Sequence, residues 1–273
     1  MSRSKPSAGL SREERNEVSE RLGLRSLQVF EIVRQEGVEE LSRPINSLFW
    51  SGIAAGLSLS LSVYCMAFLH HALEGTRLQP ALVGFGYSVG FVIVILGRLQ
   101  LFTENTITVV LPVLTDISRV KVQRTLRLWA VVFIANMIGT LASARVAMSG
   151  GILPPEQLEA ALLVSQHLLQ YSALQTLLYG IPAGFMVASI VWLIPNAKGG
   201  EFWIIVLMTY MISVGGLTHV IAGSTEWFLL AMEGDCTWVY AVFSGILPAL
   251  VGNVIGGTGL FALITYAQVK DEI

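Results

Sequence analysis

The chain has 273 residues, of which 53% are hydrophobic and 13% charged, and its formal net charge is −2. Soluble domains carry about 25% charged residues, so this composition excludes an ordinary soluble protein. The near-zero charge offers no basic field for nucleic acid. The two cysteines, Cys65 and Cys236, lack the spacing of a metal site or a redox motif.

Residues 1–46 form a polar N-terminal segment with eight of the 17 basic and eight of the 19 acidic residues. This mixture of charges excludes a signal peptide. We expect an amphipathic helix over residues 11–41 because Ser11 and Glu14 have the spacing of a capping box. The apolar residues of this helix fall roughly on one face: Val18, Leu22, Leu27, Phe30, Val33 and Leu41. We expect the segment to lie on the membrane surface or pack on the cytoplasmic face, and to be dispensable for pore formation.

Residues 47–268 read as a membrane domain, followed by a short tail at 269–273. A hydrocarbon core about 30 Å thick needs about 20 apolar residues per helix. Such blocks predict six spans, at 47–72, 81–115, 124–148, 173–194, 202–232 and 238–268, with a loop expected at 149–172. Basic residues concentrate in the N-terminal segment and in the loop at 115–127. We therefore expect an inner-membrane protein with both termini in the cytoplasm.

The second and fifth spans are too long for one crossing, and each has a polar interruption near its middle. The interruptions are Gly97–Asn105 and Gly215–His219. The third span of each half carries Asn-x-x-Gly, beginning at Asn136 and at Asn253. Two halves of three spans insert in opposite senses, which predicts inverted repeats whose broken helices meet near the midplane. Non-helical backbone at that depth is buried in protein or lines a cavity, so the two breaks are the candidate site.

The residues of the breaks leave functional and structural interpretations open. His219 is an ionisable group inside an apolar block, typical of a transport pathway, although it could instead hydrogen-bond between helices. Thr103 and Asn105 could contact a solute or cap the following half-helix. Glu104 and Arg98 favour a structural ion pair or exposure at the membrane surface. The sequence has no hydrolase elbow, phosphate loop or zinc-ligand spacing, so we expect neither an enzyme nor a cofactor.

Three motifs in order along the chain resemble the formate/nitrite transporter family, over about residues 45–268. They are Leu101–Asn105 in the second span, Gly216–Ala222 in the fifth and Gly252–Gly257 in the sixth. Residues 30–41 and the Glu-Asn pair at 104–105 are most similar to the YfdC-like branch of the family.

The resemblance implies an aquaporin-like protomer of six helices, assembled as a pentamer with one pore per protomer. The solutes would be small monovalent anions or their acids, such as formate, nitrite or hydrosulfide. The family histidine corresponds to His219 and the loop threonine to Thr103, with Glu104, Asn105 and Thr218 supporting the loops. The hydrophobic constriction corresponds to Tyr87, Phe91, Phe102 and Ile212.

The chain also departs from the family pattern. Glu104 replaces a small residue, and Gly184 and Gly223 stand where formate-type members carry pore asparagines. The lysine that those members carry ahead of the fourth span has no counterpart among residues 165–180. These departures reduce the polarity of the pore.

Three functional hypotheses follow. The first is a proton-linked channel for a small weak acid, in which hydrophobic rings exclude the bare ion and His219 donates a proton. The second is a channel for small neutral solutes, with His219 only a hydrogen-bond donor. The third is a membrane scaffold that has the fold but no open pore, with the N-terminal helix binding a partner.

Overall fold

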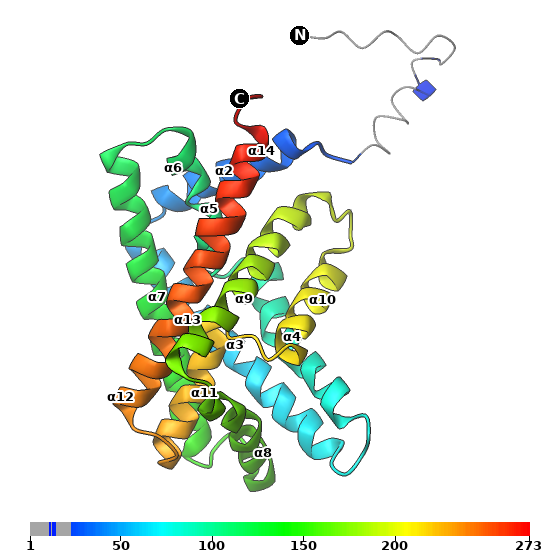
Figure 1. Cartoon of the computed structure of the whole chain (residues 1–273), viewed down its shortest axis with the longest axis vertical. Helices are drawn as coiled ribbons and strands as arrows, with labels where there is room; N and C mark the ends of the chain where they lie inside the picture. The colour runs from blue at the N-terminus through cyan, green and yellow to red at the C-terminus, as the bar shows by residue number, and fades with distance from the viewer. Residues whose placement is uncertain (1–10, 12, 15–22) are drawn as a thin grey trace.

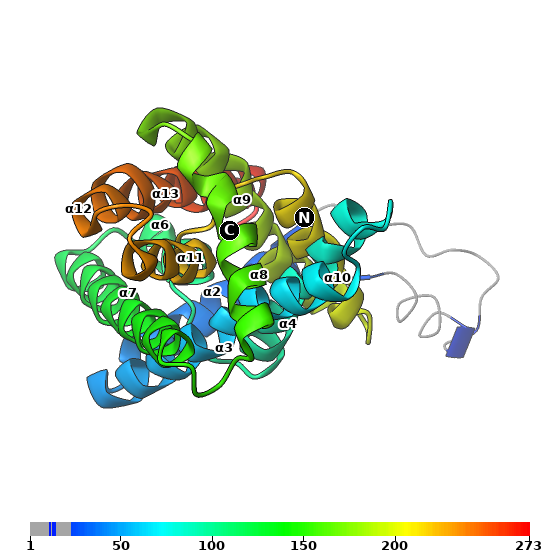
Figure 2. The same cartoon turned by 90° about the horizontal axis from the view of Figure 1, so that it is seen from below.

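A computed structural model describes residue 11, residues 13–14 and residues 23–273 of the chain. Every regular element in these residues is a helix, and the long helices run side by side (Figure 1). Helix α2 (Ser26–Ser42) and the C-terminus lie at one end of the molecule, and α8 (Pro155–Ser165) and α12 (Trp238–Tyr240) lie at the other. Seen from below, α11 (Val220–Glu233) lies between α7, α8 and α13 (Figure 2).

Five helices are long and apolar enough to cross a membrane, which makes the chain a multi-pass membrane protein. They are α3 (Ile45–Ala72), α4 (Gln79–Leu96), α7 (Arg119–Met148), α9 (Ala173–Leu193, continued to Asn196) and the continuous stretch Trp238–Val269. This last stretch comprises α12, η3 (Ala241–Ile246), α13 (Leu247–Val254), η4 (Ile255–Ala262) and α14 (Leu263–Val269). Serine caps begin two of these helices: Ser118 Oγ accepts from Lys121 N ahead of α7, and Ser172 Oγ accepts from Gln175 N ahead of α9.

The two predicted interruptions are breaks in the structure, and they share one backbone geometry. Helix α4 is followed by the short helices α5 (Asn105–Thr108) and α6 (Leu111–Thr115), while helix α10 (Glu201–Val214) is followed by α11. Arg98 and Gly216 both have left-handed backbone, with φ of 51° and 62°. The next amides close equivalent turns, from Leu99 N to Val94 O and from Leu217 N to Ile212 O.

One asparagine supports each break with the same three hydrogen bonds. The Oδ1 of Asn136 accepts from Phe102 N at 2.9 Å, and its Nδ2 donates to Gly52 O and Gln100 O. The Oδ1 of Asn253 accepts from Val220 N at 2.8 Å, and its Nδ2 donates to Gly180 O and Thr218 O. Breaking a helix frees backbone groups that must find partners when buried, and these amides supply them.

Glycines let the supporting helices approach the breaks closely. A Cβ atom added to Gly184 would lie 2.3 Å from Asn253 O, and one added to Gly56 would lie 2.3 Å from Asn136 O. Any larger residue would force α9 away from α13, or α3 away from α7. Gly184, one of the departures from formate-type members, therefore has a packing reason in this chain.

The N-terminal helix is shorter than the sequence predicts. The predicted capping box is present, since Ser11 N donates to Glu14 Oε2 and Glu14 N donates to Ser11 Oγ. However, residues 23–25 are not helical, and α2 begins only at Ser26 because Arg25 has extended backbone. Val18 and Leu22 lie outside the described residues. The buried face of α2 packs on α5, α6 and α14 through Val29, Phe30 and Val33.

The connection predicted at 149–172, between the third and fourth spans, is not an irregular loop throughout. It contains α8 and the 3₁₀ turn η1 (Gln166–Gln170), which cover α3 and α11 at the end opposite the C-terminus. Pro155 at the first position of α8 is compatible with a helix start. A helix of 11 residues is too short to cross a membrane, so a search for spans does not detect it.

Candidate functional site

The side chains of Thr103 and His219 meet where the two breaks face each other. Thr103 Oγ1 lies 2.8 Å from His219 Nε2, although 116 positions separate the residues in the chain. Thr103 is fully buried and His219 is 2% exposed. The sequence-based expectation that these two residues lie together is therefore correct.

Both nitrogens of the His219 ring are engaged. His219 is the N-cap of α11, and its Nδ1 accepts a hydrogen bond from Ala222 N at 3.2 Å. A neutral imidazole with Nδ1 as acceptor carries its proton on Nε2, so Nε2 donates to Thr103 Oγ1. The structural interpretation of His219, a bond between two elements, thus holds together with its place at the centre of the breaks.

Aromatic and aliphatic side chains surround this pair on the α4 side. The Phe91 ring meets the His219 ring edge-on with centroids 5.0 Å apart, and Tyr87 lies 5.2 Å from Phe91. Tyr87, Phe91 and Ile212 are all buried. All four predicted constriction residues, Phe102 included, are thus buried, and Tyr87 and Phe91 form a chain of ring contacts that ends at His219.

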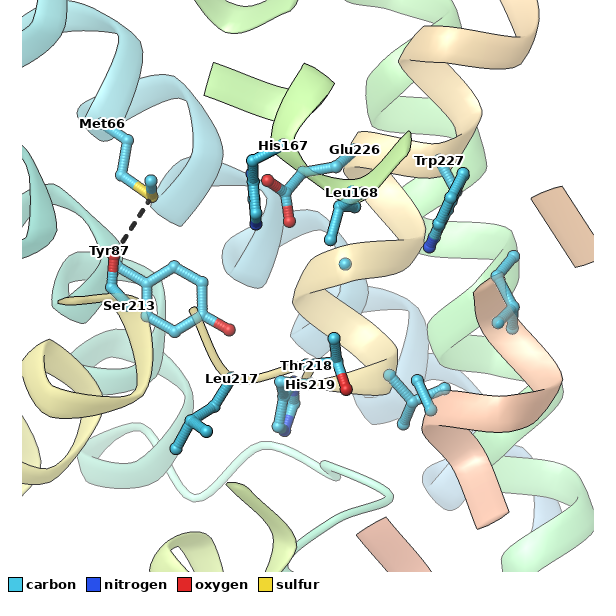
Figure 3. A pocket seen from close by; sticks show the side chains of 14 residues that line it. Met66, Tyr87, His167, Leu168, Ser213, Leu217, Thr218, His219, Glu226 and Trp227 are labelled. Carbon is cyan, nitrogen blue, oxygen red and sulfur yellow. Dashed lines mark hydrogen bonds between the residues drawn. The ribbon is translucent and has the colours of Figure 1, made fainter. Parts of the chain in front are cut away.

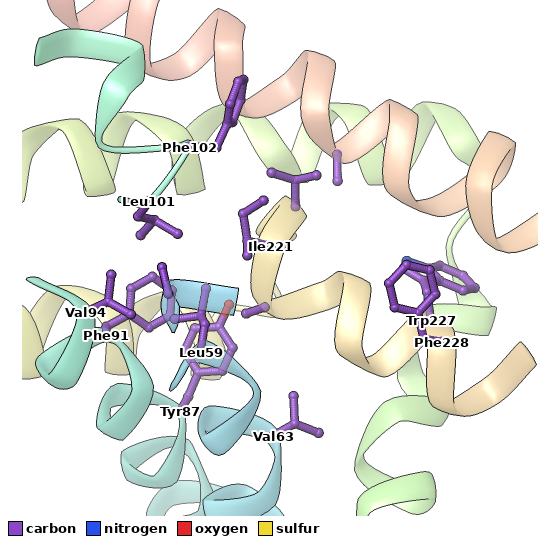
Figure 4. Close-up of a cluster of buried hydrophobic side chains, with 14 of the residues drawn as sticks. Leu59, Val63, Tyr87, Phe91, Val94, Leu101, Phe102, Ile221, Trp227 and Phe228 are labelled. Carbon is purple, nitrogen blue, oxygen red and sulfur yellow. The ribbon is translucent and has the colours of Figure 1, made fainter. Parts of the chain in front are cut away.

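The neighbouring loop residues Leu101 and Phe102 point in different directions (Figure 4). The Phe102 ring packs edge-on against Trp129 and Phe133 of α7, at 5.7 and 5.3 Å. Leu101 is fully buried and points toward the space between Phe91 and Ile221 (Figure 4). Sequence reasoning did not single out Leu101, since neighbouring loop residues cannot be assigned to opposite sides without knowing the path of the loop.

Two of the three expected loop-support residues form hydrogen bonds that hold the loops, one within its own loop and the other to helix α9. The amide of Asn105 donates to Leu101 O at 3.1 Å and to Gln100 Oε1 at 3.2 Å. The hydroxyl of Thr218 donates to Thr176 O at 2.6 Å. These bonds hold the irregular backbone in place without a solute.

Glu104, the third, makes no side-chain bond to the loop. Its Oε1 is buried and lacks a hydrogen-bond partner among the described residues. The carboxyl faces a cavity of about 320 Å³ that Glu36, Glu40 and Arg98 also line. Arg98 forms its ion pair with Glu36, at 2.8 Å, and its side chain is 79% exposed. The expected ion pair therefore exists for Arg98, but with a residue of α2.

A small enclosed cavity of about 40 Å³ lies beside His219, which lines it (Figure 3). Its polar lining includes Tyr87, His167, Thr218, His219 and Glu226. A water needs only about 10–15 Å³ by this measure, so the cavity holds a few waters or one small solute. A more open cavity of about 360 Å³ shares Met66, His167 and Ser213 with it.

Glu226 is the main site residue that sequence reasoning missed. It is 5% exposed and lies on α11, whose residues from Val220 to Ala231 are all buried. Its signal in the sequence was an acidic residue inside the apolar block 202–232, which is the same argument that singled out His219. Within residues 11, 13–14 and 23–273, no group of three His, Cys, Asp or Glu could hold a metal ion.

Comparison with known proteins agrees with this architecture. The model of the formate/nitrite transporter family matches residues 27–267. The chain belongs to this family. The inner membrane protein YfdC of Escherichia coli is 36% identical to it over 93% of this chain and 82% of its own length. The formate channel FocA of Haemophilus influenzae is 24% identical over 79% of this chain and 84% of its own length.

Solved structures of the formate/nitrite transporter family share the fold. A pentameric formate channel with formate bound matches with a TM-score of 0.69 at 19% identity, covering 83% of this chain and 97% of that one. A second ion channel of the family matches with a TM-score of 0.72 at 17% identity, covering 89% and 98%. Leu101, Thr103 and His219 thus lie at the broken helices of a transporter fold.

Proposed function

We propose that the chain forms a channel for a small monovalent anion or its conjugate weak acid, proton-linked through His219. The single observation that carries the proposal is the buried bond between Thr103 and His219 at the meeting of two broken helices. In a membrane domain, irregular backbone and an ionisable group at that depth are typical of a pathway. Membership of a transporter family supports the same function.

The six-span inverted repeat is part of this proposal. In it, α10 and α11 together make the fifth span, and the halves are related by a pseudo-twofold axis in the membrane plane. The matching hydrogen bonds of Asn136 and Asn253 support the repeat. So do the matching left-handed residues Arg98 and Gly216. The inner membrane and cytoplasmic termini follow from the charge distribution.

The chemistry of passage follows from the surroundings of His219. Phe91, Tyr87, Leu101 and Ile221 make the axis apolar, so a bare anion pays a large desolvation cost there. The Nε2–H of His219 can turn from Thr103 to the solute and donate a hydrogen bond or a proton. A neutral acid then crosses the apolar region more readily than its anion.

A neutral-solute channel is the second candidate. The observation that favours it is the charge of the two cavities beside the axis. The smaller contains Glu226 and no lysine or arginine in its lining, and the larger contains three glutamates with one arginine. Carboxylates repel anions, whereas a neutral hydrogen-bonding solute is unaffected by the sign of the charge.

A flux screen in proteoliposomes tests both candidates and the scaffold hypothesis. The solutes are formate, acetate, nitrite, hydrosulfide, glycerol and water, each measured at several pH values. Protein-dependent flux of an acid that rises as pH falls supports the proposal. Flux of glycerol or water without acid transport favours the neutral-solute channel. No flux of any solute through correctly assembled protein supports the scaffold and contradicts the proposal.

A further inference from the structure

Glu226 has a buried carboxyl that forms no hydrogen bond or ion pair with a described residue. It is 5% exposed and accepts no hydrogen bond from the described part of the chain. It points into the small cavity beside His167 (Figure 3). Its Oε2 lies 3.9 Å from the place of a Cβ atom on Gly223, so the absence of a side chain at 223 leaves the carboxyl open to the cavity. A structural glutamate at this depth would have a partner.

His167 presents a free nitrogen to the same region. Its Nδ1 lies 2.7 Å from Val164 O, and a carbonyl only accepts, so Nδ1 is the donor. The Nε2 of the neutral ring is then an acceptor without a partner among the described residues. His167 also lines the more open cavity, so the ring stands between that cavity and the one containing Glu226.

Among the described residues, the lining of the Glu226 cavity includes no lysine or arginine. Tyr87 of α4, His167 of η1 and His219 line its cavity. The pKa of the nearby Tyr171 phenol is raised by burial first, then by Tyr179 and then by the charge of Glu226. The other elements add only uncharged groups to the lining of this cavity: Met66 from α3, Ile246 from η3, Ala249 from α13 and Leu168 from η1. The charged residues of the remaining neighbours lie elsewhere: Arg145 of α7 lies beside Ala231 and Met232 at the C-terminal end of α11, and Glu156 and Glu159 of α8 are exposed. A carboxyl in such surroundings is stable when it carries a proton or meets a hydrogen-bond donor.

The hydrogen bonds of His219 imply that a second group must replace a proton lost from its Nε2. Because Nδ1 caps α11, a proton cannot reach the ring there without breaking the bond to Ala222 N. A His219 that gives up its Nε2 proton therefore needs a nearby source that has no structural bonds of its own. Glu226 has that property, and it lies about two turns further along the same helix.

We propose that Glu226 is the proton-exchange site of the channel, with His167 linking it to the open cavity, and that its ligand is the anion of a small weak acid. His219 Nε2 gives its proton to an oxygen of the anion, and the O–H bond of the protonated Glu226 carboxyl breaks as its proton replaces the one lost from Nε2. The acid moves on as a neutral molecule and leaves the Glu226 carboxylate, which regains a proton from the open cavity through His167 Nε2. The ionised carboxylate repels further anions until it is protonated again.

This inference rests on the proposed function for its solute, and the first experiment uses formate as the probe. Protein-dependent formate uptake is measured in proteoliposomes of defined orientation while pH changes only on the side of this cavity. A single proton uptake gives at most about a tenfold rise in flux per pH unit, which we expect in part of the range for the wild type. The variant E226Q, which keeps size and hydrogen bonding, should vary by less than about twofold over the same range. E159Q, exposed on α8, is the matched control. A wild-type pH profile in E226Q would overturn the inference.

The second experiment needs no transport. Infrared difference spectra between low and high pH are recorded on the assembled protein without solute. We expect one protonated-carboxyl band that E226Q removes and that E104Q and E159Q retain; the buried carboxyl of Glu104 can give a separate band, which only E104Q removes. The variant H167Q should retain the band but slow its hydrogen–deuterium exchange at least about tenfold, since it removes the free ring nitrogen.

The two measurements distinguish failure of the proton site from failure of the proposed function. If E226Q removes no band, or if the wild type shows no band at any pH, the proton site is overturned. The band without flux of any solute overturns the proposed function while supporting the proton site.

Discussion

At the scale of single residues, His219 has two separable duties: it caps α11 through Nδ1 and contacts Thr103 through Nε2. In His219→Asn the short amide is a good N-cap, so we expect the protein to fold and assemble. The variant cannot carry charge or reach Thr103, so the change of flux with pH should disappear. Flux is measured against pH in proteoliposomes, and assembly by size-exclusion chromatography. Unaltered flux at every pH in assembled protein would contradict proton donation by His219.

Thr103 tests the partner of the same bond. Thr103→Val leaves the buried Nε2–H of His219 without an acceptor, which costs about 1–3 kcal/mol of unfolding free energy. Thr103→Ser keeps the hydroxyl and should lose far less. Thermal unfolding in detergent compares the two variants with the wild type. Equal loss in both would mean that the methyl packing of Thr103, and not its hydroxyl, stabilises the site.

At the scale of elements, each break depends on one asparagine. Asn136→Ala and Asn253→Ala each strand one backbone N–H and two carbonyls, and the cost is about 1–3 kcal/mol for each buried group left unpaired. We expect both variants to unfold at clearly lower temperature and by similar amounts. Asn46→Ala, exposed near the start of α3, is the control. A large effect at one break and none at the other would count against equivalent roles.

Helix α2 packs against α6 and α14, so we now expect that removing residues 1–40 destabilises the molecule, whereas the sequence alone predicts that they are dispensable. Deleting them exposes the cluster that Phe30 and Val33 form with α6 and α14. Phe30→Ala alone should cost about 3–5 kcal/mol, whereas Gln35→Ala on the exposed face should be nearly neutral. Deleting residues 1–22 should leave the assembly intact. Normal thermal stability of the 1–40 deletion would show that the packing of α2 contributes little.

At the scale of the whole molecule, we predict a homopentamer. The likeness to a pentameric channel supports this symmetry, and large apolar residues lie exposed on the outer faces of α3 and α7, among them Leu57, Leu61, Ile134, Ile138 and Leu141. Lipid or neighbouring protomers can cover such faces. Native mass spectrometry in mild detergent measures the stoichiometry, with delipidation as a control for bound lipid. A monomer or tetramer as the main species would overturn the prediction.

The sequence by itself determined the class of protein, the long spans and the two breaks. These properties depend on local composition: the length of an apolar run sets a crossing, and a polar, glycine-containing interruption ends it. The motifs around Thr103, His219 and Asn253 also indicated the family, and the two breaks predicted that Thr103 and His219 lie together.

Only the tertiary structure decided which side chains face each other across the breaks. The tautomer of His219 depends on Ala222 N, and the packing of Phe102 depends on α7. Glu226 and His167 line one cavity because α8 packs on α11 and η1 follows α8, and no local pattern encodes that packing. A single ionisable residue in an apolar block indicates an energetic cost of burial. Whether that residue has a partner depends on elements that are distant in the chain.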